Sequence, residues 1–299
     1  MRLDPRALRL FLAVCREGTI SGAARALHLS QPSVSVAISQ LERGLGTQLF
    51  ERDRQGIQLL PAGQALLKSA EAMENLLDAA HQEVQLLNQN ISGPLVIGGT
   101  PGALATLIPK VLQNFTNVHP RLDLRILERP EARLHDLLRS FHLDLAVSTA
   151  EMSECPDDLN ELAILGDPFS LMVGRENGHL PNKISLADLA HSKWVLPDAV
   201  GGFRRQIDAM FINAQVSMPT NVIRSDSLLT TKAIVKNTDY ITILPNEVAA
   251  TELATGTLRG IRIREASFPR RVGILWLKER SPSYLVQSFI EHSRQVANV

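Results

Sequence analysis

The chain has 299 residues, 44% of them hydrophobic and 21% charged, which is enough for about two globular domains. Its 31 basic and 31 acidic residues balance, so net charge alone gives no support for a nucleic-acid partner, and without an apolar run of about 18 residues no membrane partner is expected. Two cysteines and a first segment unlike a signal peptide argue against a disulfide framework and predict a cytoplasmic protein.

Charge is unevenly distributed, however. Residues 1–68 contain nine basic residues, eight of them arginine, against five acidic ones, a net charge of +4. A local positive excess of this size permits contact with phosphate groups without demonstrating it.

Residues 1–60 are predicted to form a winged helix-turn-helix domain. Thr19 and Ser30 are suited to cap a second and a third helix, and Pro32 fits the first turn of the third. The segment LGTQLFERDRQGIQLL, with a glycine between apolar runs, favours a β-hairpin wing. Helical spacing predicts that the first helix buries Leu8, Phe11, Leu12 and Cys15, and that the third buries Val34, Ile38, Leu41 and Leu45.

The face of the third helix opposite this apolar stripe carries almost no charge. Gln31 can exchange paired hydrogen bonds with adenine, and Ser33 and Ser35 can bond to bases or phosphates. Val36 could pack only on a thymine methyl group or exclude water. A simple solvated face is the alternative, but lysine and glutamate would be commoner there. Phosphate attraction would then fall to Arg52 and Arg54, beside the wing.

Residues 61–91 are predicted to be a long linker helix that begins at Pro61. Its apolar residues repeat with alternating spacings of four and three, which is typical of a two-helix coiled coil and predicts dimerisation. The alternative is a helix packed on its own domain. The predicted seam contains Leu66, Ala70, Met73, Leu77, Ala80, Val84 and Leu87.

Residues 92–299 alternate apolar strands with helical stretches, the pattern of an α/β domain. Junctions at 98–103 and 196–203 place loops at the carboxyl ends of strands, where such sheets bind ligands. Thr100 offers a hydroxyl, and the N–H groups of Gly102 and Ala103 would open a helix that suits a carboxylate. A plain strand-to-helix turn is the alternative, since GGTPGALATLIP matches neither a P-loop nor a dinucleotide fingerprint.

No catalytic set, cofactor motif or metal-ligand spacing is present, and the eight scattered histidines are expected at the surface. An α/β enzyme carrying a helix-turn-helix would need a clustered acid–base or metal set. A periplasmic solute-binding protein would need a signal peptide in place of the helical first 90 residues. Neither alternative is favoured, and no enzyme activity, cofactor or metal is expected.

The segment GTISGAARALHLSQPSVSVAISQLERGLGTQLFER resembles the winged helix-turn-helix signature of LysR-type transcriptional regulators, and LLPAGQALL continues it. The resemblance implies a homodimer or homotetramer that binds a two-fold symmetric promoter site in double-stranded DNA and responds to a small-molecule effector. It places Gln31, Pro32, Ser35 and Val36 at base edges, and Ser33 and Arg52 at the DNA backbone. Arg54 is added for its charge. Leu60 departs from the threonine common in relatives, so the wing–linker junction is expected to be less well fixed.

More loosely, GPLVIG, DLAVS and ITILP resemble the family's effector domain, which is two-lobed and similar to periplasmic binding proteins. The first lobe would span about 92–161 and 265–299, and the second about 162–264. An effector between the lobes is expected to be an anionic metabolite, as Arg204 and Arg205 hint, although solvated helix charges are the alternative. The effector residues implied are Thr100, Gly102, Ala103, Thr149, Gly202 and Phe203.

Overall fold

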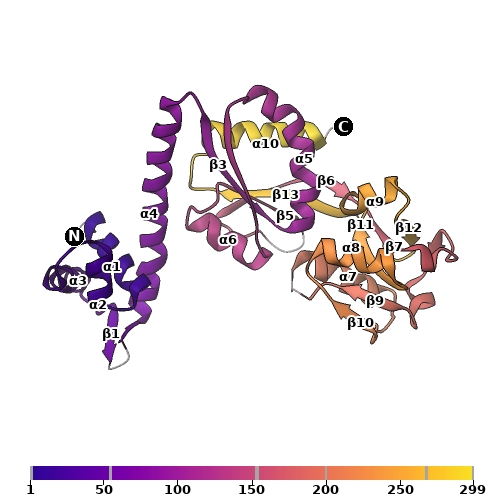
Figure 1. Ribbon diagram of the computed structural model, residues 1–299, viewed down its shortest axis with the longest axis horizontal. Helices are drawn as coiled ribbons and strands as arrows, with labels where there is room; N and C mark the ends of the chain where they lie inside the picture. The colour runs from indigo at the N-terminus through magenta and orange to yellow at the C-terminus, as the bar shows by residue number, and fades with distance from the viewer. Residues whose placement is uncertain (1–2, 54–55, 152–154, 199–200, 267–268, 298–299) are drawn as a thin grey trace. The chain divides into compact units, whose positions relative to one another are not determined.

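The computed structural model describes residues 3–53, 56–151, 155–198, 201–266 and 269–297. It divides into two compact units, one of residues 1–88 with 139–142 and one of residues 89–138 with 143–299 (Figure 1). None of the helices in the described ranges combines the length and the apolar character needed to span a membrane.

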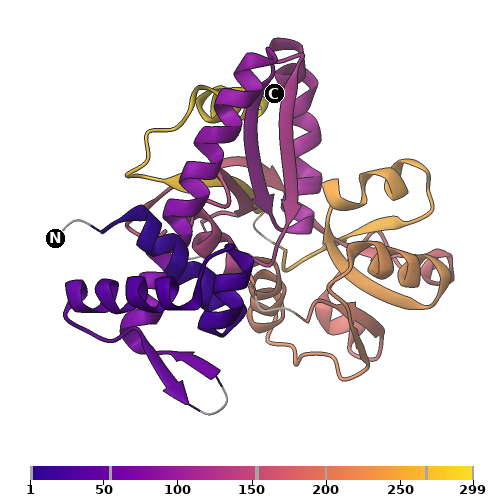
Figure 2. The ribbon, with the colours of Figure 1, turned by 60° about the vertical axis from the view of Figure 1, so that its left-hand side comes forward.

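The first unit has the predicted winged helix-turn-helix order. Its elements are α1 (Pro5–Glu17), α2 (Ile20–Ala26), α3 (Gln31–Leu45), β1 (Phe50–Asp53), β2 (Gly56–Leu59) and α4 (Pro61–Asn88). Both predicted caps are confirmed: Thr19 Oγ1 accepts the N–H of Gly22 at 3.0 Å, and Ser30 Oγ accepts the N–H of Ser33 at 3.2 Å. The β1–β2 hairpin is antiparallel and projects beyond the three helices (Figure 2).

The core of this unit contains Phe11, Leu12, Val34 and Ile38, as the helical spacing predicts. Leu45, however, is 38% exposed, because the helix ends there at Gly46 in the left-handed conformation. The Cys15 thiol is only half-buried, and burial raises its pKa to about 11. A thiol with such a pKa is almost wholly protonated and unreactive at neutral pH.

The junction of the wing and α4 has well-defined contacts although Leu60 provides no side-chain cap. Leu60 N–H donates to the Leu49 carbonyl at 2.9 Å, and its own carbonyl accepts Gln64 N–H at 2.9 Å. A Cβ on Gly63 would lie 2.3 Å from the Leu49 carbonyl oxygen, so only glycine permits this close approach. Backbone contacts therefore hold this junction, and the expected loosening relative to relatives with threonine stays a prediction.

Helix α4 changes its environment along its length. Leu66 and Ala70 are buried in the core of the first unit, and Met73 packs against that core. From Leu77 onward the seam is exposed: Leu77 by 42%, Val84 by 60% and Leu87 by 63%. The first turns of the helix therefore pack on their own domain, and the pairing of the exposed apolar seam of its later turns with a second helix stays a prediction.

The second unit contains two sheets. The first has the strand order β4-β3-β5-β13-β6, in which β3 is parallel to β4 and β5, and β13 is antiparallel to β5 and β6. The elements of this lobe are β3 (Ser92–Gly99), α5 (Pro101–Val118), β4 (Leu122–Glu128), α6 (Glu131–Arg139), β5 (Leu145–Thr149), β6 (Leu159–Asp167), β13 (Arg270–Leu277) and α10 (Tyr284–Ala297).

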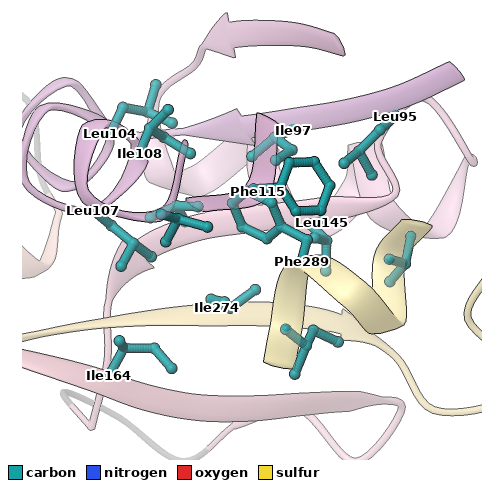
Figure 3. Packing of buried hydrophobic residues seen from close by; sticks show 14 of the residues in the cluster. Leu95, Ile97, Leu104, Leu107, Ile108, Phe115, Leu145, Ile164, Ile274 and Phe289 are labelled. Carbon is teal, nitrogen blue, oxygen red and sulfur yellow. The ribbon is translucent and has the colours of Figure 1, made fainter. Parts of the chain in front are cut away.

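Helices cover both faces of this sheet, as the continuous apolar strands require. On one face Phe115 of α5 and Phe289 of α10 meet edge to face at 5.4 Å over Leu145 (Figure 3). Ala146, the next residue of β5, belongs to the cluster under α6 on the other face. His119 lies beside this core and is only 5% exposed; its Nε2 bonds to Ser288 Oγ at 2.9 Å. Its expected surface position was wrong, and burial lowers its pKa.

The second sheet has the order β10-β9-β11-β7-β12-β8 and forms the second lobe. Alternation again separates two faces: Trp194 packs on Phe211 of α7 at 5.5 Å, whereas Val195 joins the cluster with Val235 of α8. Its strands are β7 (Phe169–Val173), β8 (Lys183–Ile184), β9 (Lys193–Leu196), β10 (Val222–Arg224), β11 (Tyr240–Pro245) and β12 (Arg259–Ile263), and its α-helices are α7 (Gly202–Asn213), α8 (Leu228–Asn237) and α9 (Ala250–Ala254).

The chain passes between the two lobes twice, from β6 to β7 and from β12 to β13 (Figure 1). At this crossing Asp167 and Arg270 face each other in the register of the antiparallel β6–β13 pair. Because β6 and β13 belong to the first sheet, the first lobe continues to Asp167 and begins again at Arg270. The predicted domain and lobe limits otherwise stay predictions.

Candidate nucleic-acid interface and ligand pocket

Helix α3 presents the uncharged surface that the sequence indicates. Gln31, Pro32 and Ser33 are exposed, Ser35 is half-buried, and Val36 is 53% exposed. Ser33 Oγ shares a 2.7 Å hydrogen bond with Ser30 Oγ, so its hydroxyl lies at the first turn of the helix, where a phosphate is favoured. This surface can therefore offer hydrogen bonds and one apolar contact to a groove.

The predicted arginines of the wing are only partly described. Arg52 belongs to β1 and lies opposite Ile57 in the hairpin register. Arg54 lies outside the described residues. The wing is tied to the helices on both sides, because Ile57 N–H donates to the Gly18 carbonyl at 3.2 Å and Leu49 N–H donates to Glu42 of α3 at 2.9 Å. Helix α3 and the hairpin therefore form one rigid surface.

The second unit contains a cavity of about 270 Å³ that both lobes line. Thr100, Gly102 and Thr149 of the first lobe and Phe203 of the second line it, as the sequence predicts. This volume is near the lower end of the usual range for small-molecule sites, roughly 300–1,000 Å³. Much of the remaining wall is apolar and comes from the second lobe, namely Val195, Leu228, Leu244, Pro245 and Val248.

The other two predicted effector residues are placed differently. Ala103 is fully buried, and its N–H donates to the Thr100 carbonyl at 3.1 Å. The Ala103 N–H, which was expected to bind a ligand carboxylate, thus already has an acceptor in the protein. Gly202 packs against Thr149, and its N–H donates to Glu131 Oε2. The backbone N–H groups of both residues thus have acceptors within the protein.

Arg204 and Arg205, the predicted hints of an anionic ligand, also have partners. Arg204 bonds to Asp208 at 2.7 Å and to the Pro197 carbonyl at 2.6 Å, and Arg205 Nη2 bonds to Glu131 at 2.8 Å. Arg205 is a solvent-exposed helix charge, as the alternative describes, with a side chain 43% exposed, whereas the Arg204 side chain is only 18% exposed.

Arg270, which the sequence reasoning missed, lines the same cavity while its side chain and backbone are only 2% exposed. Its Nε and Nη2 are buried with no hydrogen-bond partner in the described part of the chain. The Nη1 atom lies 2.9 Å from the position that a Cβ on Gly102 would occupy, so the guanidinium abuts the first turn of α5. A charged group buried in this way is costly unless an anion or acceptor reaches it.

Electrostatics of the crossing keep this group cationic. Burial lowers the pKa of Arg270 to about 10, and the nearby Asp167 partly offsets the change. Burial likewise raises the pKa of Asp167, opposed by the Glu247 N–H that donates to it at 3.0 Å. Arg270 therefore remains protonated at neutral pH and places a guanidinium cation at the α5 end of the cavity.

Three residues with donor groups line the cavity at the N-terminus of α5: Thr100, Gly102 and Arg270. Thr100 precedes the helix but makes no side-chain cap bond, and Gly102 N–H has no acceptor among the described backbone bonds. Together with Arg270 these groups supply a hydroxyl, a backbone N–H and a guanidinium, which suit a carboxylate. Within the described residues, no cluster of three or more His, Cys, Asp or Glu residues could hold a metal ion.

A winged helix-turn-helix joined to a two-lobed pocket defines a ligand-responsive DNA-binding protein. Two family models agree with this class: "Bacterial regulatory helix-turn-helix protein, lysR family" matches residues 5–64, and "LysR substrate binding domain" matches residues 88–298. The chain belongs to the LysR family of transcriptional regulators. It is thus a DNA-binding transcription regulator with an effector-binding domain, and the enzyme and solute-binding alternatives are wrong.

Individual relatives extend over nearly the whole chain. The HTH-type transcriptional regulator CfxR of Cupriavidus necator is 31% identical over 259 residues, which cover 86% of this chain and 80% of CfxR. The HTH-type transcriptional regulator GbpR of Azospirillum brasilense is 27% identical, with 93% and 82% covered. Among solved structures, full-length CbnR complexed with its target DNA superposes with a TM-score of 0.73. Its sequence is 22% identical to this chain, and the match covers 98% of this chain and 100% of the CbnR chain. This likeness confirms the fold.

Proposed function

We propose that this regulator acts in the cytoplasm on a two-fold symmetric promoter site, which a homodimer or homotetramer reads through α3 and the β1–β2 wing. The uncharged exposed face of α3 supports base readout, with Gln31 and Ser35 as its hydrogen-bonding groups. Arg52 and Arg54 would contact phosphates, as would Ser33 at the first turn of α3. Val36 would pack on a thymine methyl group. CbnR, the structural relative complexed with DNA, has the same fold.

Gln31→Ala and Ser35→Ala are each expected to weaken operator binding about 10- to 100-fold, because a base contact in the major groove is worth roughly 1–3 kcal/mol. Footprinting of genomic fragments should first identify an interrupted, symmetric site, and gel-shift titration should then measure the change in affinity. Gln113→Ala, an exposed glutamine in the second unit, is the matched control. Unchanged affinity in both α3 variants would contradict the assignment of the reading helix.

The effector is, in this proposal, a small anionic metabolite whose charged group binds Arg270, Thr100 and Gly102 N–H. The observation that carries it is the buried guanidinium of Arg270, which lines the cavity without a protein hydrogen bond at Nε or Nη2. Thr149 and Phe203 would contact the body of the ligand. Both lobes line the cavity, so a bound ligand can contact both. It would favour one arrangement of the lobes only if it binds that arrangement more tightly than the others.

A thermal-shift screen of small metabolites tests this proposal. A ligand present at 100 times its Kd should stabilise the native state by about 2.7 kcal/mol. Carboxylates or other small anions should dominate the compounds that raise Tm, whereas a set composed only of cations or neutral compounds would contradict an anionic effector.

A further inference from the structure

The N-termini of α5 and α7 both lie at the wall of the cavity, and that of α7 already has a protein carboxylate. Glu131, the first residue of α6, lines the cavity and reaches the N-terminus of α7 in the other lobe. Its Oε2 accepts the N–H of Gly202, and its Oε1 accepts Nη2 of Arg205 at 2.8 Å. The cap residue of α7, Gly201, has no side chain to do this. Glu131 therefore supplies the anion that a helix N-terminus favours.

The N-terminus of α5 has the opposite character. Its cap residue, Thr100, makes no side-chain bond, and Arg270 abuts its first turn with two unpartnered nitrogens. Arg270 as a whole residue is 2% exposed and lines the cavity, so its guanidinium is a buried group of the cavity wall rather than a surface cation. At the α5 N-terminus, donor groups that suit an anion thus have no acceptor among the residues that the structure describes, whereas at the α7 N-terminus the carboxylate of Glu131 accepts their hydrogen bonds.

The other two cations of the cavity wall, Arg129 and Arg204, each make hydrogen bonds within the protein. Arg129 Nη1 donates to the Glu128 carbonyl at 2.7 Å, and Arg204 is held by Asp208 and the Pro197 carbonyl. Asp226 adds a further negative charge to the wall, and it accepts Asp198 N–H at 2.9 Å. A second anionic group at the α7 end of the cavity would therefore meet Glu131, which already accepts the Gly202 N–H and pairs with Arg205.

We propose that Glu131 is a specificity-determining residue: it occupies the α7 end of the cavity and restricts the effector to a single anionic group on a largely apolar body. This inference rests on the proposed anionic effector and names its chemical class. The apolar side chains of Leu228, Leu244 and Val248 suit such a body, because they offer no hydrogen bonds to a second charged group. Selectivity then comes from repulsion and occupied donors as much as from attraction.

Matched acids of equal chain length test the inference on the full-length protein. The probes are the monocarboxylates butanoate, hexanoate and octanoate and the corresponding α,ω-dicarboxylates succinate, adipate and suberate, with Kd measured by isothermal titration calorimetry. Wild-type protein should bind at least one monocarboxylate about tenfold or more tightly than its dicarboxylate partner. Glu131→Ala should remove most of this preference by freeing Gly202 N–H and Arg205 for a second carboxylate.

Two further variants separate the effect of the Glu131 charge from the effect of its hydrogen bonds to the α7 N-terminus. Glu131→Gln keeps an oxygen for Gly202 N–H but removes the charge, so it should reduce the preference less than Glu131→Ala. Glu128→Ala removes another carboxylate of the cavity wall without freeing α7, and it should keep the wild-type preference. Thermal unfolding of each variant confirms folding before titration.

The outcomes distinguish the two proposals. Equal binding of both acid classes by wild-type protein, or a preference that Glu131→Ala leaves unchanged, would overturn the role of Glu131 while keeping an anionic effector. Absence of saturable binding by all six acids would overturn the carboxylate site at Arg270 and the selectivity built on it. A preference that weakens equally in Glu128→Ala and Glu131→Ala would also overturn it, because general charge repulsion would then be sufficient.

Discussion

Replacing Arg270 by methionine is expected to weaken carboxylate binding about 30- to 1,000-fold. The fold change corresponds to roughly 2–4 kcal/mol, the usual cost of removing one partner of a buried, hydrogen-bonded charge pair. Methionine retains the length and apolar stem of the side chain but supplies no donor at the α5 N-terminus, where Nη1 of Arg270 now lies. Calorimetric titration with a monocarboxylate that raises Tm measures the change in Kd directly.

The neighbouring residue provides the control for this variant. Arg271 follows Arg270 in β13, but its side chain is 54% exposed and pairs with Glu151, so Arg271→Met should leave Kd unchanged. Because Asp167 would lose the positive charge beside it, the double variant Asp167→Asn with Arg270→Met tests whether the loss of affinity reflects an uncompensated charge. Carboxylate binding of wild-type strength by Arg270→Met would refute the assigned site.

The winged helix-turn-helix could be predicted because its determinants are local in sequence. Thr19 and Ser30 cap helices whose first turns begin one residue later, and Val34, Ile38 and Leu41 repeat at helical spacing. Tertiary packing and helix-end effects were not predicted in this way. Gly63 fits against Leu49, and the expected buried Leu45 is instead exposed at a helix end, where the core no longer reaches it.

The pocket could be predicted only in part because its polar groups come from distant segments. Thr100, Gly102, Thr149 and Phe203 follow from strand–helix junctions and from the family resemblance, and all four line the cavity. Arg270 is adjacent to an identical residue, Arg271, and no local pattern distinguishes the buried arginine from the exposed one. Only the β6–β13 register brings Arg270 opposite Asp167, and only the fold brings Glu131 to α7.

Glutamate at Val84 and Leu87 together is expected to dissociate the homodimer and to lower operator affinity by about 100-fold or more. Each substitution places a charge in the exposed seam of α4, where a partner helix would have to bury it. Two linked DNA-binding domains bind a two-part site roughly 10²–10⁴ times more tightly than one domain alone, and a monomer loses this advantage. Sedimentation velocity measures the oligomeric state, and gel-shift titration of the footprinted site measures the affinity.

The position of these residues separates loss of pairing from loss of folding. Leu66 and Ala70 lie in the core of the first unit, so a charge at either position would unfold this unit. Val84 and Leu87 are exposed and lie beyond that core. The double variant should therefore keep the wild-type melting of the first unit. Gln85→Glu adds a charge beside the seam and should remain dimeric. If the Val84→Glu, Leu87→Glu protein sediments as a wild-type dimer, α4 is not the pairing element. A dimer lost without lower operator affinity would instead mean that each α3 reads its half-site independently.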